Sequence, residues 1–205
     1  MEQSKKLVLF DFDGVLIDTL MVCYGINTFV NEDLSLEEYK GFFDGNIHDA
    51  KRTNGKAKEG HPNFHEEYRN KTRELVIPQV LKDSVKFLAS KYTLVIVSST
   101  PTISIKKILE REGLEDCFKD VLGADVHASK VIKINSMLEK YKINSVDALF
   151  ITDTLGDIRE AFSCGVVSIG VTWGFQERET LAKGNPKIIL ENPEDLTKGV
   201  ESILC

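Results

Sequence analysis

An apolar run that ends in two aspartates and a glycine constrains this chain more than any other feature. Residues 7–10 carry no polar side chain, which is typical of a strand buried on both faces of a parallel sheet. Asp11 and Asp13 follow directly, and Gly14 allows a sharp turn there. Open α/β folds bind ligands at the carboxyl ends of their parallel strands. Because the two carboxylates repel each other, we expect a divalent metal ion to compensate their charge.

Strand-like and helix-like segments alternate through the second half of the chain. The further expected strands are residues 93–97, 121–124, 148–152, 166–171 and 187–190. The helices expected between them are residues 80–90, 101–112, 130–141 and 155–164. This order predicts an α/β fold with a doubly wound, Rossmann-like parallel sheet.

The segment after the first strand does not follow this alternation. Helical apolar spacing covers residues 20–31, and another helix is expected to begin near Pro62. We therefore predict a small α-helical cap at residues 18–78, inserted after the first strand. The predicted Rossmann-like core then consists of residues 1–17 and 79–205.

Charge and hydropathy exclude several classes of partner. The formal net charge of −6 disfavours broad binding to nucleic acid or to an anionic membrane. No apolar run approaches the ~20 residues that cross a bilayer, and Asp11 and Asp13 interrupt the stretch that a secretory signal would need. The four cysteines form no CxxC pair, which argues against a zinc site. We expect a cytoplasmic protein with a small-molecule partner, either a monomer or a homodimer.

Polar residues stand at or shortly after four of the expected strands. They are Asp11 with Asp13, then Ser98, then Lys130, and finally Asp153 with Asp157. If the strands lie side by side, these residues converge at one edge of the sheet. Carboxylates can hold a metal that neutralises phosphate, and lysine adds a compact positive charge. A hydroxyl and the N–H groups of a helix start can bind phosphate oxygens. The set suits phosphoryl transfer, in which an aspartate can attack phosphorus.

In this order along the chain, the polar residues resemble the four motifs of the haloacid-dehalogenase-like (HAD) hydrolase superfamily. The matching residues are Asp11-Phe12-Asp13-Gly14-Val15, Ser98, Lys130 and Asp153-Thr154-Leu155-Gly156-Asp157. The resemblance covers essentially the whole chain. The inserted segment resembles the small helical cap of the phosphoglycolate-phosphatase-like and β-phosphoglucomutase-like branch. The resemblance implies a Mg²⁺-dependent phosphomonoesterase that hydrolyses a small phosphate ester through an aspartyl phosphate.

The resemblance also implies catalytic roles. Asp11 would be the nucleophile, and Asp13 would protonate the leaving alkoxide and then activate water. Ser98 would bind the transferring phosphoryl group, and Lys130 would offset the charge on Asp11 and the phosphate. Asp13 disfavours the dehalogenase and phosphonatase branches, because in the pattern of the family those branches have no aspartate at this position.

A magnesium site is the cofactor site that the resemblance implies. Its ligands would be Asp11, Asp153 and the backbone carbonyl of Asp13, while Asp157 would either ligate the metal or position other groups. Thr152 stands where the family usually has glycine, and its β-branched side chain makes the backbone stiffer there.

Some residue assignments stay open at this point. Ser99 is an alternative to Ser98 as the phosphate-binding residue, and Lys133 is an alternative to Lys130, one helical turn later. A serine at such a turn can also be a simple helix cap. A lysine on a helix is most often a solvated side chain.

The cap offers candidates for binding the leaving group. Arg52 and Lys56 lie in a stretch without periodicity, residues 44–65, and could bind an anionic leaving group there. An exposed loop is the alternative interpretation. Trp173 and Phe175 follow an expected strand and either line the pocket or pack in the core.

Two alternative functions remain from the sequence. A phosphomutase of the β-phosphoglucomutase type resembles this chain at Thr19, but those enzymes carry a histidine four residues later, where this chain has Cys23. A non-catalytic binding module on the same fold is the second alternative, because a fold does not fix a function.

Overall fold

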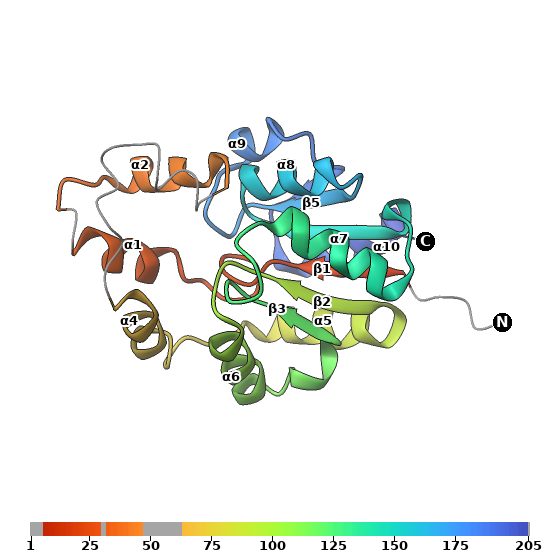
Figure 1. Cartoon of the computed structure of the whole chain (residues 1–205), viewed down its shortest axis with the longest axis horizontal. Coiled ribbons are helices and arrows are strands. Elements are labelled where there is room, and N and C mark those ends of the chain that lie inside the picture. The colour runs from red at the N-terminus through yellow and green to blue at the C-terminus, as the bar shows by residue number, and fades with distance from the viewer. Residues whose placement is uncertain (1–5, 30–31, 47–62, 205) are drawn as a thin grey trace.

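The computed structural model describes residues 6–29, 32–46 and 63–204 and confirms the predicted α/β fold. Its centre is a six-stranded parallel sheet in the order β3-β2-β1-β4-β5-β6 (Figure 1). The strands are β1 (Leu7–Phe10), β2 (Thr93–Val97), β3 (Asp120–Leu122), β4 (Ala148–Thr152), β5 (Val167–Val171) and β6 (Ile188–Leu190). The first strand therefore lies between β2 and β4, so the residues that follow these three strands meet at one edge.

Helices cover both faces of the sheet. They are α5 (Gln79–Lys91), α6 (Thr102–Glu112), α7 (Lys130–Tyr141), α8 (Leu155–Ser163), α9 (Arg178–Ala182) and α10 (Leu196–Leu204). Val8 and Phe10 pack with side chains of α5, α6 and α10, whereas Leu7 and Leu9 pack with α7 and α8. Burial on both faces explains why β1 has no polar residue, since each buried side chain of this size contributes about 1.5–3 kcal/mol.

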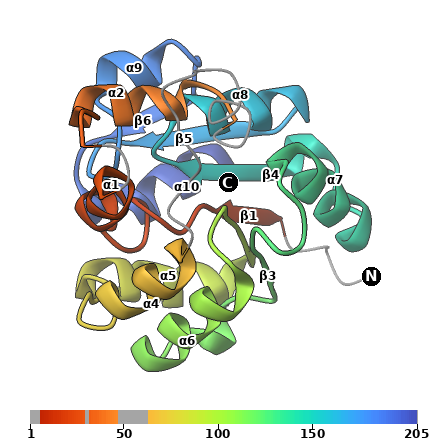
Figure 2. The same cartoon turned by 60° about the vertical axis from the view of Figure 1, so that its left-hand side comes forward.

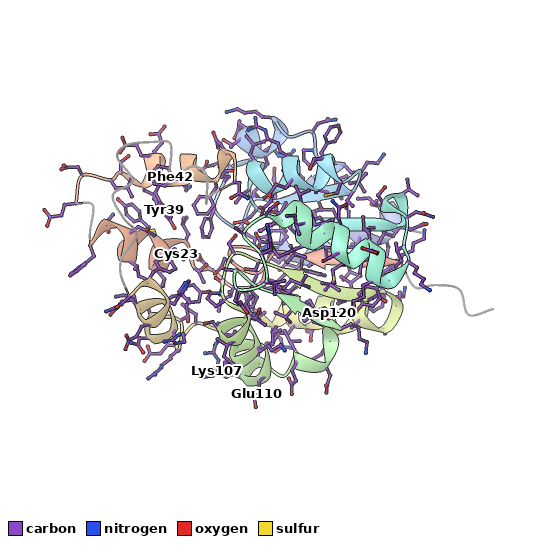
Figure 3. The ribbon with its side chains drawn as sticks, in the orientation of Figure 1. Cys23, Tyr39, Phe42, Lys107, Glu110 and Asp120 are labelled. Carbon is purple, nitrogen blue, oxygen red and sulfur yellow. The ribbon has the colours of Figure 1, made fainter. Side chains whose placement is uncertain are left out.

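Short helices form a separate group beyond the carboxyl ends of the strands. They are α1 (Leu20–Thr28), α2 (Leu36–Gly41), the 3₁₀ turn Phe42–Asp44 and α4 (Phe64–Lys71) (Figures 1 and 2). Their buried side chains make a cluster of their own, with Cys23, Tyr39 and Phe42 gathered among these helices (Figure 3). A helical group thus follows the first strand as expected. We refer to it as the cap, and the exact limits at residues 18 and 78 stay a prediction.

The sequence-based prediction of elements was right in kind and wrong at several ends. The third expected strand, 121–124, is shifted to Asp120–Leu122, and the first cap helix ends at Thr28 rather than 31. The prediction omitted α9 and α10, although Leu196, Val200 and Leu204 of α10 are buried at helical spacing. Pro62 lies outside the described residues. Among the described residues, no helix combines the length and apolar character needed to span a membrane.

Candidate active site

A cavity of about 330 Å³ lies where the carboxyl ends of the strands face the cap. The core contributes its charged and polar walls, which are Asp11, Asp13, Ser99, Thr100, Lys130, Asp153, Thr154, Asp157 and Glu160. The cap contributes mainly aromatic and small polar side chains, among them Cys23, Asn27, Tyr39, Phe43 and Phe64. The structure therefore brings six of the predicted site residues to one cavity, namely Asp11, Asp13, Ser99, Lys130, Asp153 and Asp157.

The turn after β1 places both of its aspartates at this cavity. Asp11 continues the sheet, because its N–H donates to the Ile151 carbonyl at 2.9 Å. Gly14 then adopts a φ of +74°, a conformation that favours glycine. A β-carbon there would lie 1.9 Å from Oδ2 of Asp153, so glycine is needed for space as well as for conformation. The short apolar strand and the glycine turn together fix where Asp11 and Asp13 point.

Lys130 joins two carboxylates at the floor of the cavity. Its Nζ lies 2.7 Å from Oδ2 of Asp11 and 2.6 Å from Oδ2 of Asp157, and the side chain is 5% exposed. Burial alone would lower the pKa of Lys130, but the two carboxylates raise it well above its ordinary value. The raised pKa favours the charged form of Lys130, which contacts Asp11, and the catalytic role that the resemblance implies for it stays a prediction.

Asp157 is held by a second partner as well. The Thr152 hydroxyl donates to Oδ2 of Asp157 at 2.8 Å, and the same oxygen accepts from Lys130. Burial raises the pKa of Asp157, yet Lys130 and these hydrogen bonds outweigh it and hold the net pKa below its ordinary value. The threonine that replaces the usual glycine thus supplies a contact to the site. These contacts favour a positioning role for Asp157, while direct metal ligation by this residue stays a prediction.

Replacing Thr152 with valine tests this contact. The Thr152→Val change keeps the shape of the side chain but removes the donor to Asp157, so we expect a loss of about 1–3 kcal/mol in unfolding free energy. Urea denaturation measures it, with Thr152→Ser as the control that keeps the hydroxyl. A valine variant as stable as wild type would show that the hydrogen bond contributes nothing.

The two carboxylate oxygens of Asp153 differ in their hydrogen bonding. Its Oδ2 accepts from the Phe175 N–H at 2.7 Å, whereas its buried Oδ1 has no hydrogen-bond partner among the described residues. Burial raises the pKa of Asp153 to about 7, an effect to which the Asp157 charge adds. A buried acceptor without a partner costs free energy and therefore calls for an explanation such as a bound ion.

The charges of the floor fit a divalent cation. Asp11, Asp153 and Asp157 face one ammonium group, Lys130, and burial with the neighbouring carboxylates raises the pKa of Asp11 well above its ordinary value. Within the described ranges, no three acidic, histidine or cysteine side chains form a metal-binding group. The predicted magnesium site uses only two carboxylates, Asp11 and Asp153, and the backbone carbonyl of Asp13. These ligands are enough because Mg²⁺ commonly keeps several waters in its coordination shell. The residues present fit magnesium.

Three hydroxyl groups donate to the side chain of Asp13. Oδ1 accepts from Thr19 at 2.8 Å and from Tyr68 at 2.6 Å, and Oδ2 accepts from Thr100 at 2.7 Å. Burial, with the Asp13 charge as the next contribution, raises the pKa of Tyr68 well above its usual range, so its hydroxyl keeps its proton. The Asp13 side chain is thus oriented by hydroxyl groups and is separate from the Lys130 network.

Ser98, which the resemblance predicts to bind the phosphoryl group, lies in the turn after β2. It is fully buried, it does not line the cavity, and its hydroxyl accepts from the Thr100 N–H at 3.0 Å. Ser99, the alternative, lines the cavity together with Thr100. The oxygen of Ser98 accepts a hydrogen bond within the turn after β2, and its proton remains available for donation. Phosphate binding by Ser98 stays a prediction, and of the two serines only Ser99 lines the cavity.

The structure separates the two candidate lysines. Lys133 is 1% exposed and donates to the Ser98 carbonyl at 2.5 Å, away from Asp11. Burial lowers the pKa of Lys133 to about 8, with the charge of Lys130 as the next cause. Lys130, not Lys133, contacts the predicted nucleophile, while Lys133 supports the backbone of the turn after β2.

The start of α7 is capped by a residue of a neighbouring helix, although the preceding residue, Ser129, is of a type that commonly caps helices. Ser129 occupies the N-cap position, but its hydroxyl makes no capping hydrogen bond to the helix. Oε1 of Glu160, from α8, accepts from the Lys130 N–H at 3.0 Å instead. A carboxylate from a neighbouring helix thus fixes the residue that bears the active-site ammonium group.

The remaining predicted residues divide between the cavity and other places. Phe175 lines the cavity, whereas Trp173 does not and donates its Nε1 proton to the Val15 carbonyl at 3.1 Å. Arg52 and Lys56 lie outside the described residues, so their predicted contact with the leaving group stays a prediction.

Sequence reasoning missed several residues that build the site. Thr100 lies two positions after Ser98 in a run of three hydroxyl residues, and that run was the available signal. Tyr68 and Glu160 gave no local signal, because each reaches the site from a helix distant in sequence. Their roles depend on how the helices pack.

The amino-acid sequence matches a family model described as haloacid dehalogenase-like hydrolase over residues 8–171. This span contains the turn after β1, Lys130 and the acidic residues after β4. The chain belongs to the haloacid dehalogenase-like hydrolase family and is an enzyme, so a non-catalytic binding module is set aside.

Relatives and solved structures agree with this membership. A phosphoglycolate phosphatase from Vibrio parahaemolyticus is 25% identical, with 97% of each chain covered. A probable phosphatase from Dickeya dadantii is 25% identical, covering 98% of this chain and 95% of the relative. A haloacid dehalogenase-like hydrolase from Streptococcus pneumoniae has the same fold, with a TM-score of 0.78, 21% identity and coverage of 96% and 99%. A putative β-phosphoglucomutase from Thermotoga maritima also shares it, with a TM-score of 0.71, 20% identity and coverage of 97% and 100%.

Proposed function

We propose that this chain is a Mg²⁺-dependent phosphatase that hydrolyses a small phosphate monoester through an aspartyl phosphate on Asp11. The contact that carries the proposal is the buried pairing of Asp11 with Lys130, 2.7 Å apart. Asp13, two positions after Asp11, is oriented independently by three hydroxyl groups. One carboxylate beside a fixed cation and a second one held by hydroxyls give a nucleophile and an acid–base group distinct environments. The names of the curated relatives support phosphatase chemistry.

The proposed reaction has two steps. A carboxylate oxygen of Asp11 bonds to phosphorus while the ester oxygen leaves and takes a proton from Asp13. A water molecule then attacks phosphorus and gives its proton to Asp13, and the bond between Asp11 and phosphorus breaks to release inorganic phosphate. Lys130 stabilises the negative charge beside Asp11 in both steps.

Magnesium would be held by Asp11, Asp153 and the Asp13 carbonyl, and when bound it supplies positive charge that offsets the phosphate. The cap limits access of water to the cavity, which strengthens the electrostatic interactions within it.

The substrate proposed here is a small soluble ester. Phosphoglycolate is one candidate, because several relatives are phosphoglycolate phosphatases. The described cap wall carries the aromatic side chains Tyr39, Phe43 and Phe64 together with the polar residues Asn27, Asn46 and His65. We assign binding of the glycolate carboxylate to the cationic residues Arg52 and Lys56 of the predicted cap loop.

The identity of one residue, Cys23, disfavours a phosphomutase function. Cys23 lies in the cavity wall four residues after Thr19, where the resemblance to mutases would require histidine. The likeness to the Thermotoga maritima protein concerns the fold alone. We therefore place a mutase second to a phosphatase.

A panel of phosphate esters separates these functions. Inorganic phosphate and remaining ester are measured together for phosphoglycolate, sugar phosphates, nucleotides and simple alkyl phosphates. A phosphatase releases one phosphate for each ester consumed, whereas a mutase converts one ester into another with little free phosphate. A preference for phosphoglycolate that disappears in Arg52→Ala or Lys56→Ala would assign those residues to the leaving group.

Magnesium is expected to stabilise the protein more at about pH 8 than at about pH 6. Because burial raises the pKa of Asp153 to about 7, the metal-free native state holds a proton there at the lower pH. Magnesium must displace that proton, so its affinity falls by up to about tenfold per pH unit below the pKa. Melting temperatures with and without magnesium measure the effect. Asp153→Asn should abolish the gain, and an equal gain at both pH values would contradict the role of Asp153.

A further inference from the structure

The cap makes a direct hydrogen bond to the proposed acid–base residue. The Tyr68 hydroxyl of α4 donates to Oδ1 of Asp13 at 2.6 Å, across 55 residues of sequence. The tyrosine is 1% exposed, so solvent does not compete for this contact. Hydrogen bonds to a carboxylate are stronger than those between neutral groups.

The three donors to Asp13 come from three different parts of the chain. Thr19 stands at the entrance to the cap, directly before α1, and Thr100 lies in the turn after β2. Tyr68 belongs to the last described helix of the cap. Since hydroxyl groups both donate and accept, the same three contacts can hold Asp13 with or without its proton.

The ring of Tyr68 is fixed within the cap itself. It stacks on Phe64 with ring centroids 6.2 Å apart and is buried with Ile26 and Tyr39. The Tyr68 carbonyl accepts from the Thr72 hydroxyl at 2.8 Å, which anchors its backbone. The phenolic oxygen therefore sits where the cap places it, and displacement of α4 from the core would remove it from Asp13.

We propose that Tyr68 is a positioning residue that orients Asp13 towards the ester oxygen when the cap is docked. This inference rests on the proposed phosphatase function. It makes the alignment of the proton donor depend on cap docking, so proton transfer to the leaving group is efficient only in the closed cavity.

The loss of activity on substitution of Tyr68 should depend on the leaving group of the ester. This dependence distinguishes a positioning role from a purely structural one. An alkoxide needs a proton as it leaves, whereas p-nitrophenolate is a stable anion that leaves without one. The ratio kcat/KM reports the step up to release of the leaving group, which is the step in which Asp13 acts as an acid. A misaligned Asp13 should therefore slow alkyl esters selectively.

The test compares Tyr68→Phe with wild type on an alkyl phosphate and on p-nitrophenyl phosphate. We expect kcat/KM to fall about tenfold for the alkyl ester and less than about twofold for the aryl ester, as loss of one charge-assisted hydrogen bond allows. The quotient of the two values is independent of the fraction of folded enzyme, so partial unfolding does not obscure the result. The control is Tyr24→Phe, which removes a cap hydroxyl that donates to the Leu34 carbonyl and does not line the cavity.

Each outcome has one meaning. A selective loss in Tyr68→Phe together with an unchanged quotient in Tyr24→Phe supports the positioning role. An unchanged quotient in Tyr68→Phe, or an equal shift in Tyr24→Phe, overturns it. Failure of the wild-type enzyme to hydrolyse either ester in the presence of magnesium would instead overturn the proposed phosphatase function.

Discussion

Replacing Asp11 with asparagine is expected to lower the rate of phosphate release by a factor on the order of 10⁴ or more. The amide is a poor nucleophile and cannot form the acyl phosphate, and removal of a covalent nucleophile typically produces losses of this size. The fold should persist, because the side chain keeps its shape and burial already disfavours the charge of Asp11, whose pKa it raises.

Activity and stability must be measured together for this variant. Phosphate release is compared with that of Asp83→Asn, a control in which an exposed aspartate on α5 loses the same charge. Urea denaturation confirms that Asp11→Asn is folded. A folded Asp11→Asn enzyme with more than about one tenth of the wild-type rate would exclude Asp11 as the nucleophile, given the losses expected for such a group.

Replacing Lys130 with methionine is expected to damage both activity and stability. Methionine fills similar space but leaves Asp11 and Asp157 without the ammonium group that lies within 2.7 Å of each. We expect a loss of about 3–5 kcal/mol in unfolding free energy at about pH 8, as for other buried charges deprived of a partner. Loss of one positive group at the phosphate should lower kcat by a factor on the order of 10²–10³.

The stability loss in Lys130→Met should depend on pH in a defined direction. In wild type, burial raises the pKa of Asp11 and acts against the lowering of the Asp157 pKa by Lys130. Without the lysine we therefore expect both pKa values to lie above those of the unfolded chain. The penalty is then fully present above the raised pKa values and shrinks as falling pH protonates the pair. Urea denaturation at about pH 8 and about pH 5 tests this, with the exposed Lys107→Met as control. A loss that is equal at both pH values would show that charge is not its cause.

The features that sequence reasoning predicted are those fixed by short stretches of chain. The strand Leu7–Phe10 and the turn at Gly14 depend on neighbouring residues, so their structure and the placement of Asp11 and Asp13 follow from local patterns. The parallel direction of the strands follows from the alternation of strands and helices, whereas the order in which β1 lies between β2 and β4 comes from the structure. Convergence of the acidic residues and Lys130 was expected on the condition that their strands lie side by side, and the structure places them at one cavity.

The features that were missed depend on packing between distant segments. Tyr68 reaches Asp13 only because α4 folds back over the sheet edge, and Glu160 caps α7 only because α8 lies beside it. Thr152 was recognised as unusual, but its hydrogen bond to Asp157 required the direction of α8. The position of Ser98 in the motif likewise did not reveal that its hydroxyl oxygen accepts from the Thr100 N–H.

The most direct test of a metal-dependent phosphatase is phosphate release by the wild-type protein from a panel of small esters, with magnesium and after EDTA treatment. We predict release from a narrow subset of esters, one phosphate per ester consumed, that EDTA abolishes and added magnesium restores. No release from any ester, with magnesium binding confirmed by calorimetry, would contradict the proposed function. Release that persists after EDTA would contradict its dependence on a metal.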